Sequence, residues 1–153
     1  MGSVRSRLID GGTACMNGIV GLAAGILFVV SAIHVYWAFG GRWGGQAALP
    51  QKTGGGALFV PRIPETLTVA ALLAAIAFML MAQAGWLSFW SARVWTRWGC
   101  ALCALAFFVR AVGDFRYLGF FKKIKSTPFA DYDTRLYSPL CLALAVAFAV
   151  VLI

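Results

Sequence analysis

The sequence predicts an all-α, polytopic membrane protein, a bundle of four transmembrane helices. Three observations predict this fold class. The chain is 61% hydrophobic and only 12% charged, whereas soluble domains carry about 25% charged residues. Its apolar residues are gathered in four long runs, and its charged, glycine and tryptophan residues lie in the breaks between them. A soluble domain of 153 residues could not hide this much apolar surface, because too much of its area faces water.

The first predicted helix spans residues 16–39, which is long enough to cross a hydrocarbon core of roughly 30 Å. Arg5 and Arg7 precede this run, so a cleaved signal peptide is the alternative. No small-residue cleavage site follows the run, which ends in aromatic residues such as Trp37 and Phe39. We therefore expect an uncleaved helix.

The second predicted helix follows a break at residues 40–62. This break is rich in glycine and contains Pro50, a composition that indicates a loop. The second helix is expected over residues 64–86. Pro64 suits its first turn, where a missing N–H costs no hydrogen bond, and Glu65 suits the positive end of the helix dipole.

Residues typical of a membrane–water interface precede the third helix: Trp86, Trp90, Trp95, Trp98, Arg93 and Arg97. The third helix is expected over residues 92–121. The fourth is expected over residues 138–153, because Ser138 and Pro139 have the pattern of an N-cap followed by a first-turn proline. Together the four helices would make residues 1–153 a single domain.

Basic residues are distributed unequally between the two ends of the predicted bundle. The loops after the first and third helices carry eight of them: Arg42, Lys52, Arg62, Arg116, Lys122, Lys123, Lys125 and Arg135. The other end carries four: Arg5, Arg7, Arg93 and Arg97. Because basic loops stay in the cytoplasm, we expect both large loops inside the cell and both termini outside. We expect the lipid bilayer as partner and no nucleic acid, since the basic residues are not clustered on a soluble face.

Ionisable residues at membrane depth are costly, so they are candidates for function. Alternating crossings bring the candidates to one end of the bundle, that of the two large loops. The candidates for ligand binding or proton handling are His34, Trp37, Glu65, Arg110, Asp114, Arg116, Tyr117, Asp133 and Tyr137.

Most of these candidates also have a structural interpretation. Arg110 and Asp114 are four residues apart, so on one helix they would form an ion pair. Glu65 has the position of a carboxylate that stabilises a helix start, and Asp133 that of a turn cap or a partner for a nearby basic residue. His34 is the only histidine, and a metal would need further ligands that are not obvious. The sequence therefore predicts no metal site and no cofactor.

Cys100 and Cys103 form a C-x-x-C pattern on the third predicted helix. Four-helix membrane oxidoreductases of the vitamin K epoxide reductase kind carry such a pair to reduce a quinone. Those enzymes also relay electrons through loop cysteines, and the two large loops here contain none. We interpret the pair as packing, with redox chemistry as the alternative.

Three segments together resemble a known family: HVYWAFGGRWG (34–44), RAVGDFRYLGFFKK (110–123) and TPFADYDTRLYSPLCL (127–142). The family consists of small bacterial four-helix membrane proteins and is catalogued as a domain of unknown function. The resemblance implies a four-helix fold in a bacterial inner membrane. It implies no activity, so no catalytic role follows from it.

Three kinds of function remain open. The first is a non-enzymatic small-molecule or ion carrier, or a ligand-binding accessory module, because no nucleophile–base pair and no phosphate loop is visible. Four helices are few for a transporter, so the carrier would be a homo-oligomer or have a membrane partner. The second is an assembly subunit of a larger membrane complex. The third is a lipid- or quinone-modifying enzyme that uses His34 as general acid or base with Asp114 or Glu65. We favour a non-enzymatic role.

Overall fold

The computed structural model describes residues 2–50, 59–87, 93–114, 117–123 and 127–153, with side chains from residue 11 onward except residues 46 and 47. Within these ranges the chain forms helices and connections, without a strand. The helices are α1 (Gly2–Ala38), α2 (Gly45–Ala48), α3 (Ile63–Gln83), α4 (Val94–Val112), α5 (Pro128–Tyr132), the π-helical turn η1 (Asp133–Tyr137) and α6 (Ser138–Val150).

Four stretches are long and apolar enough to cross a membrane: Gly11–Ala38, Ile63–Gln83, Val94–Val112 and Pro128–Val150. The fourth stretch joins α5, η1 and α6 into one continuous helix. The predicted fold class, an all-α protein with four candidate transmembrane helices, is thereby confirmed.

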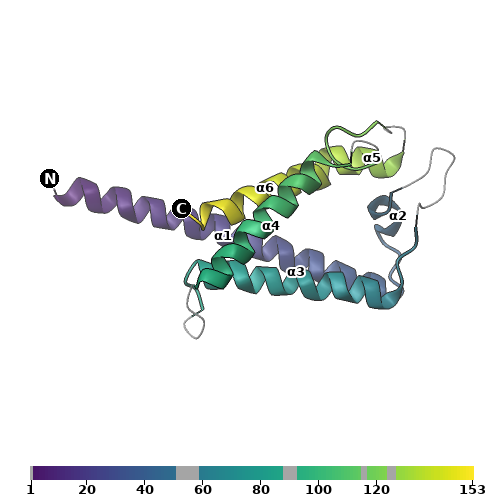
Figure 1. The fold of residues 1–153 in the computed structure, drawn as a ribbon, viewed down its shortest axis with the longest axis horizontal. Helices are drawn as coiled ribbons and strands as arrows, with labels where there is room; N and C mark the ends of the chain where they lie inside the picture. Colours follow the sequence, from purple (N-terminus) through teal and green to yellow (C-terminus); the bar gives the residue numbers. More distant parts are fainter. Residues whose placement is uncertain (1, 51–58, 88–92, 115–116, 124–126) are drawn as a thin grey trace.

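The long helices form two pairs (Figure 1). In one pair α1 packs along α3, and in the other α4 packs along α6. The pairs meet near the connection between α3 and α4 and diverge toward the opposite end, where α2 lies against α5. We call the end where the pairs meet the terminal end, because the C-terminus lies there. The end where they diverge is called the loop end.

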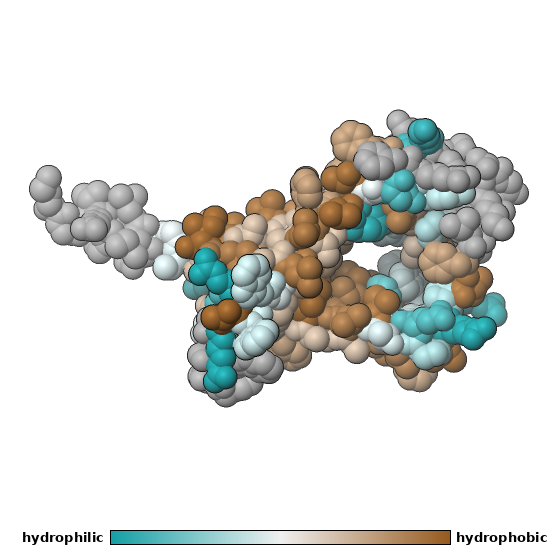
Figure 2. Space-filling model, viewed as in Figure 1, coloured by the Kyte–Doolittle hydropathy of each residue, from teal (hydrophilic) through white to brown (hydrophobic). Residues whose placement is uncertain are grey.

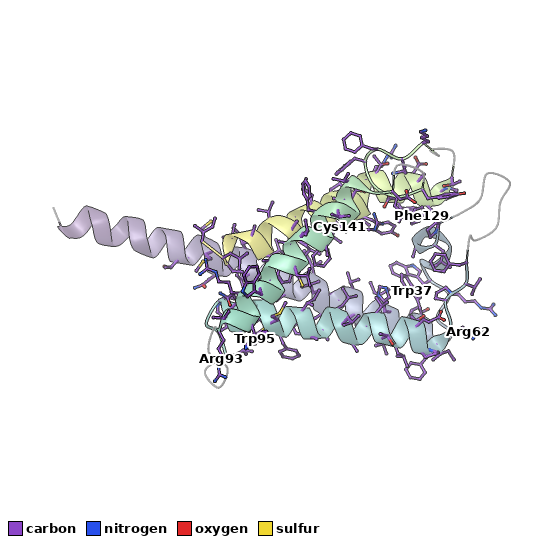
Figure 3. The ribbon with its side chains drawn as sticks, viewed as in Figure 1. Trp37, Arg62, Arg93, Trp95, Phe129 and Cys141 are labelled. Carbon is purple, nitrogen blue, oxygen red and sulfur yellow. The ribbon has the colours of Figure 1, made fainter. Side chains whose placement is uncertain are left out.

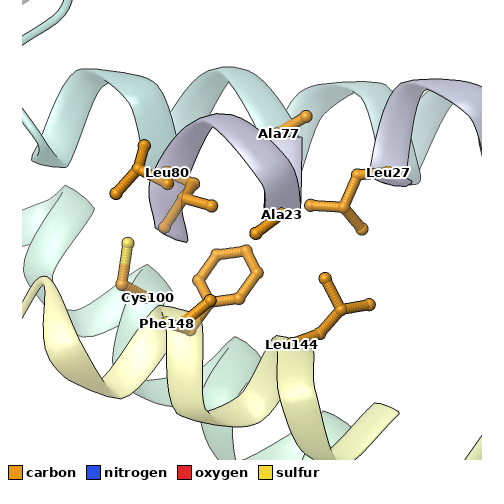
Figure 4. Close-up of a cluster of buried hydrophobic side chains, with 9 residues drawn as sticks. Ala23, Leu27, Ala77, Leu80, Cys100, Leu144 and Phe148 are labelled. Atoms are coloured by element: carbon orange, nitrogen blue, oxygen red, sulfur yellow. The ribbon is translucent and has the colours of Figure 1, made fainter. Parts of the chain in front are cut away.

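The hydrophobic core lies where the pairs meet. Phe148 of α6 is fully buried among residues of all four long helices, including Leu27, Leu80 and Cys100 (Figure 4). The cluster comprises Val20, Ala23, Leu27, Ala77, Leu80, Cys100, Leu144, Ala147 and Phe148. Its members follow the three- and four-residue spacing that puts side chains on one face of a helix. The core therefore packs the two helix pairs against each other near the terminal end, and the pairs are separated near the loop end.

The third long helix ends much earlier than predicted. α4 stops at Val112 rather than residue 121, because Gly113 adopts φ +91°, where L side chains are strained. A Cβ on Gly113 would also collide with the carbonyl of Leu118, which folds back against it. The first helix also differs, since α1 begins at Gly2 rather than at residue 16.

The fourth long helix begins earlier than predicted. Thr127 accepts a hydrogen bond from the N–H of Ala130 (3.2 Å), and Pro128 occupies the first turn. This is the cap-and-proline pattern that the sequence suggested for Ser138, which instead lies inside a continuous helix. Pro139 has no N–H to donate within that helix. The π-helical turn η1 ends two residues before Pro139, and in it the N–H of Ser138 donates to the carbonyl of Asp133.

Candidate functional site

A single buried carboxylate organises the loop end of the second helix pair. Asp133, in η1, is 0% exposed. Its Oδ1 accepts a hydrogen bond from Arg110 Nη2 (2.8 Å), and its Oδ2 accepts one from Lys122 Nζ (2.9 Å). The backbone N–H of Gly119 also donates to Oδ2 (2.7 Å). Asp133 thus ties together the end of α4, the loop that follows it and the start of the fourth long helix.

Lys122 is the second buried charge of this cluster, at 2% exposure. Its ammonium group also lies 3.0 Å from the carbonyl of Gly119 and 2.6 Å from Thr134 Oγ1. A buried charge is tolerated when it is paired and hydrogen-bonded, and Lys122 meets both conditions. The primary role of this cluster is therefore to hold the loop against the helices.

The cluster carries more positive than negative charge. Arg110 and Lys122 share one carboxylate, so one positive charge is in excess. Arg110 Nη1 is buried and has no hydrogen-bond partner among the described residues. An unpaired buried donor is uncommon in native proteins. Arg110 Nη1 could therefore still donate a hydrogen bond.

The ion pair that the structure shows for Arg110 is with Asp133, whereas the sequence predicted Asp114 as its partner. That prediction assumed one continuous helix, and the chain leaves α4 at Gly113. Asp114 Oδ1 accepts hydrogen bonds from the backbone N–H groups of Tyr117 (2.7 Å) and Leu118 (2.8 Å). Asp114 therefore stabilises the turn after α4. Arg116, another predicted candidate, lies outside the described residues.

His34 lies on the face of α1 that looks toward the space between the helix pairs. It follows Leu27 by two helical turns, so it continues the face that carries the α1 core residues. His34 Nδ1 lies 2.8 Å from the carbonyl of Val30, so Nδ1 carries the proton and donates. The ring packs edge-on against Trp37, with centroids 5.2 Å apart.

Tyr137 and Cys141 extend the core-facing side of the other pair in the same way. They precede Phe148 by eleven and seven residues, close to whole numbers of helical turns. Tyr137 packs near the ring of Phe129, with centroids 6.1 Å apart. Figure 3 shows Trp37 projecting into the space between the helix pairs and Cys141 on the opposite side of that space.

The remaining candidates act locally. Glu65 Oε2 accepts a hydrogen bond from the N–H of Arg62 (2.8 Å), which caps the start of α3 as its position suggested. Tyr117 belongs to the turn that Asp114 holds. Sequence reasoning missed Lys122 and Thr134 as site residues, because nothing in the local pattern separates a buried lysine from its loop neighbour Lys123.

The C-x-x-C cysteines lie in the packed half of the molecule. Cys100 is fully buried in the core cluster, and Cys103 packs against that cluster while partly buried. Both cysteines are free thiols. This placement agrees with a packing role for both cysteines.

The space between the diverging pairs is open. Figure 2 shows an opening through the molecule at the loop end, with hydrophobic side chains toward the core and hydrophilic ones toward the outer rim. Figure 3 shows Trp37 of α1 and Cys141 of α6 on its two sides. The helical spacing puts His34 and Tyr137 on the same faces as the core residues of these two helices. The opening therefore has an apolar inner part and a polar outer part.

These features define a class, a four-helix polytopic membrane protein whose polar side chains collect at one end of the bundle. The chain belongs to the family described as "Protein of unknown function (DUF3995)", whose model matches residues 27–148. This match confirms the resemblance of the three segments to a family of unknown function. The matched range extends from the core residue Leu27 to the core residue Phe148. No curated protein and no solved structure matches the chain.

Proposed function

We propose that this protein is a non-enzymatic ligand-binding module of the bacterial inner membrane, and that its ligand is an amphiphile held between the two helix pairs. The opening seen in Figure 2 carries the proposal. An empty space between helices loses dispersion contacts, and water is unfavourable beside apolar walls. A molecule with an apolar body and one polar end matches both parts of the opening.

The polar end of the ligand belongs near His34. Because Nδ1 donates to the Val30 carbonyl, Nε2 of the neutral ring is the hydrogen-bond acceptor. Trp37 packs beside this ring, and its own N–H donates to the carbonyl of Trp43 (2.8 Å). The site therefore suits a ligand whose polar end donates a hydrogen bond, such as a hydroxyl group, next to an aromatic surface.

A non-enzymatic role is favoured over acid–base catalysis by the partners of the carboxylates. A general acid or base must lie within hydrogen-bond reach of the group that it serves. His34 Nδ1 donates to the carbonyl of Val30, and Glu65 and Asp114 each accept a hydrogen bond from a neighbouring backbone N–H. These contacts support structural roles for the three side chains.

Mass spectrometry of molecules that co-purify with the protein tests the proposal. The parent protein, extracted from membranes in mild detergent, should carry a bound amphiphile. His34→Ala combined with Trp37→Ala should lose most of it, whereas Phe108→Ala, on an exposed surface of α4, should retain it. An amphiphile that is absent from the parent, or lost equally from both variants, would contradict the proposal.

We also propose that both termini lie outside the cytoplasm and that the loop end faces it. Eight basic residues at the loop end against four at the terminal end support this orientation. A reporter fused after Ile153 should show the activity of a reporter that is active outside the cytoplasm. Activity of a cytoplasm-specific reporter at the same position would reverse the orientation.

A further inference from the structure

A second hollow lies at the terminal end, on the outer surface between α3 and α4. It has a volume of about 680 Å³ and is lined by Ala75, Phe78, Met79, Ala82, Leu87, Arg93, Trp95 and Thr96. We call it the α3–α4 groove. Its walls are apolar except near the start of α4, and its lining residues differ from those that face the opening between the helix pairs.

The polar atoms inside the groove are already satisfied. Thr96 Oγ1 accepts a hydrogen bond from the N–H of Arg93 (2.9 Å) and donates to Gln83 Oε1 (2.7 Å). The groove therefore offers an apolar surface to its occupant and keeps any polar group of that occupant at the rim. Met79 fills the space that a side chain on Gly99 would need, so the two helices approach closely at the floor.

The rim carries uncompensated positive charge. Arg93 lines the groove, is exposed at the start of α4 and forms no ion pair with a described residue. Arg97 does not line the groove; its Nη2 lies 3.3 Å from the carbonyl of Leu152, just after α6. The acidic side chains that the structure describes belong to the loop end: Glu65, Asp114, Asp131 and Asp133.

The rim also has the composition of a membrane–water interface. Trp95 is 84% exposed and Trp98 is 70% exposed, and tryptophan concentrates at the level of lipid head groups. Figure 3 shows Arg93 and Trp95 together at this end of the molecule. The groove thus runs from the interface, where lipid phosphates lie, toward the membrane interior.

We propose that the α3–α4 groove binds an acidic phospholipid, with an acyl chain along the apolar wall and the head group at Arg93. A groove on the membrane-facing surface of two helices is filled by lipid, because an apolar hollow gains contacts only from an apolar occupant. An arginine without an acidic neighbour among the described residues is complementary to a head group with net negative charge, and a guanidinium group binds phosphate in a bidentate manner.

Competition between two lipids with identical chains tests the charge component. The purified full chain is titrated in detergent with phosphatidylglycerol or phosphatidylcholine, and bound lipid is counted by native mass spectrometry. With about 1 kcal/mol for a basic residue near an acidic lipid, Arg93 gives a preference of about fivefold for phosphatidylglycerol. Arg93→Gln should reduce the preference to within about twofold, while Lys123→Gln at the loop end should leave it unchanged.

A second variant tests the apolar component. Ala75 is exposed and lines the groove, so Ala75→Trp should fill the hollow and displace both lipids. Ala71 is exposed on α3 one turn earlier and does not line the groove, so Ala71→Trp is the matched control and should retain lipid. Equal affinity of the parent for both lipids, or a preference that survives Arg93→Gln, would overturn the proposal. A dimer that Ala75→Trp dissociates without any lipid effect would assign the groove to a second copy and overturn it as well.

Discussion

Replacing Asp133 with asparagine tests the buried charge cluster. The substitution keeps the size of the side chain and removes its negative charge. Lys122, which is 2% exposed, would then have no counter-ion in its buried position, and Arg110 would lose its ion pair. The new amide NH₂ would also face donors rather than acceptors. Breaking a buried pair by removing one partner costs about 3–5 kcal/mol.

The expected loss is large enough for thermal unfolding in detergent to measure. With about 2–4 °C for each kcal/mol in a chain of this size, a loss of about 3 kcal/mol lowers the melting temperature by about 6–12 °C. Asp131→Asn is the matched control, because Asp131 is exposed in α5, two residues before Asp133, and should shift melting by about 2 °C or less. Combining Asp133→Asn with Lys122→Met should recover part of the loss, since the stranded charge is gone.

The reasoning would be refuted if Asp133→Asn melted within about 2 °C of the parent. Equal losses for Asp133→Asn and Asp131→Asn would also refute it, because the effect would then not depend on burial. A double variant that is less stable than either single variant would mean that Lys122 contributes through packing rather than through its charge.

Three further substitutions test local features by the same unfolding measurement. Asp114→Asn should lower the free energy of unfolding by only about 0.5 kcal/mol or less, because an amide oxygen still accepts the turn hydrogen bonds. Asp114→Ala should lower it by about 1 kcal/mol. Equal losses for the two variants would argue against the turn role of Asp114. Gly113→Ala should cost more than Gly85→Ala, because both have positive φ but only Gly113 is pressed against backbone; equal losses would remove Gly113 as the reason that α4 ends. Cys100→Ala with Cys103→Ser should cost about 1–2 kcal/mol and leave the abundance in membranes nearly unchanged, and loss of a cellular phenotype at normal abundance would favour redox chemistry.

The number and order of the membrane helices were predictable from the sequence, because long apolar runs and interfacial residues report directly on the bilayer. Helix ends were less predictable. The end of α4 depends on the close approach of Gly113 to the backbone of Leu118, a tertiary contact that leaves no periodic signal. The start of the fourth long helix was misplaced because Thr127–Pro128 and Ser138–Pro139 carry the same cap-and-proline pattern, and only the structure distinguishes them.

The location of the candidate site was predictable from the sequence, but the ion pairs and hydrogen bonds between its residues were not. Placing polar residues at one end follows from the alternation of crossings, and Asp133 was expected to pair with a basic residue or cap a turn. Its partners were not predictable, since Arg110 is 23 residues away and Lys122 is 11 residues away in the sequence. Local spacing instead favoured Asp114 as the partner of Arg110, because that argument assumes a helix that does not continue.

A density map of the full chain in nanodiscs made from its own membrane lipids tests the central claim most directly. A rigid antibody fragment bound to the exposed surface would supply the mass needed for imaging. The proposal predicts elongated non-protein density between the two helix pairs, with its polar end within hydrogen-bond distance of His34 Nε2 and beside Trp37. Helix pairs that close on one another, with α1 packed along the full length of α6 and no density between them, would contradict it.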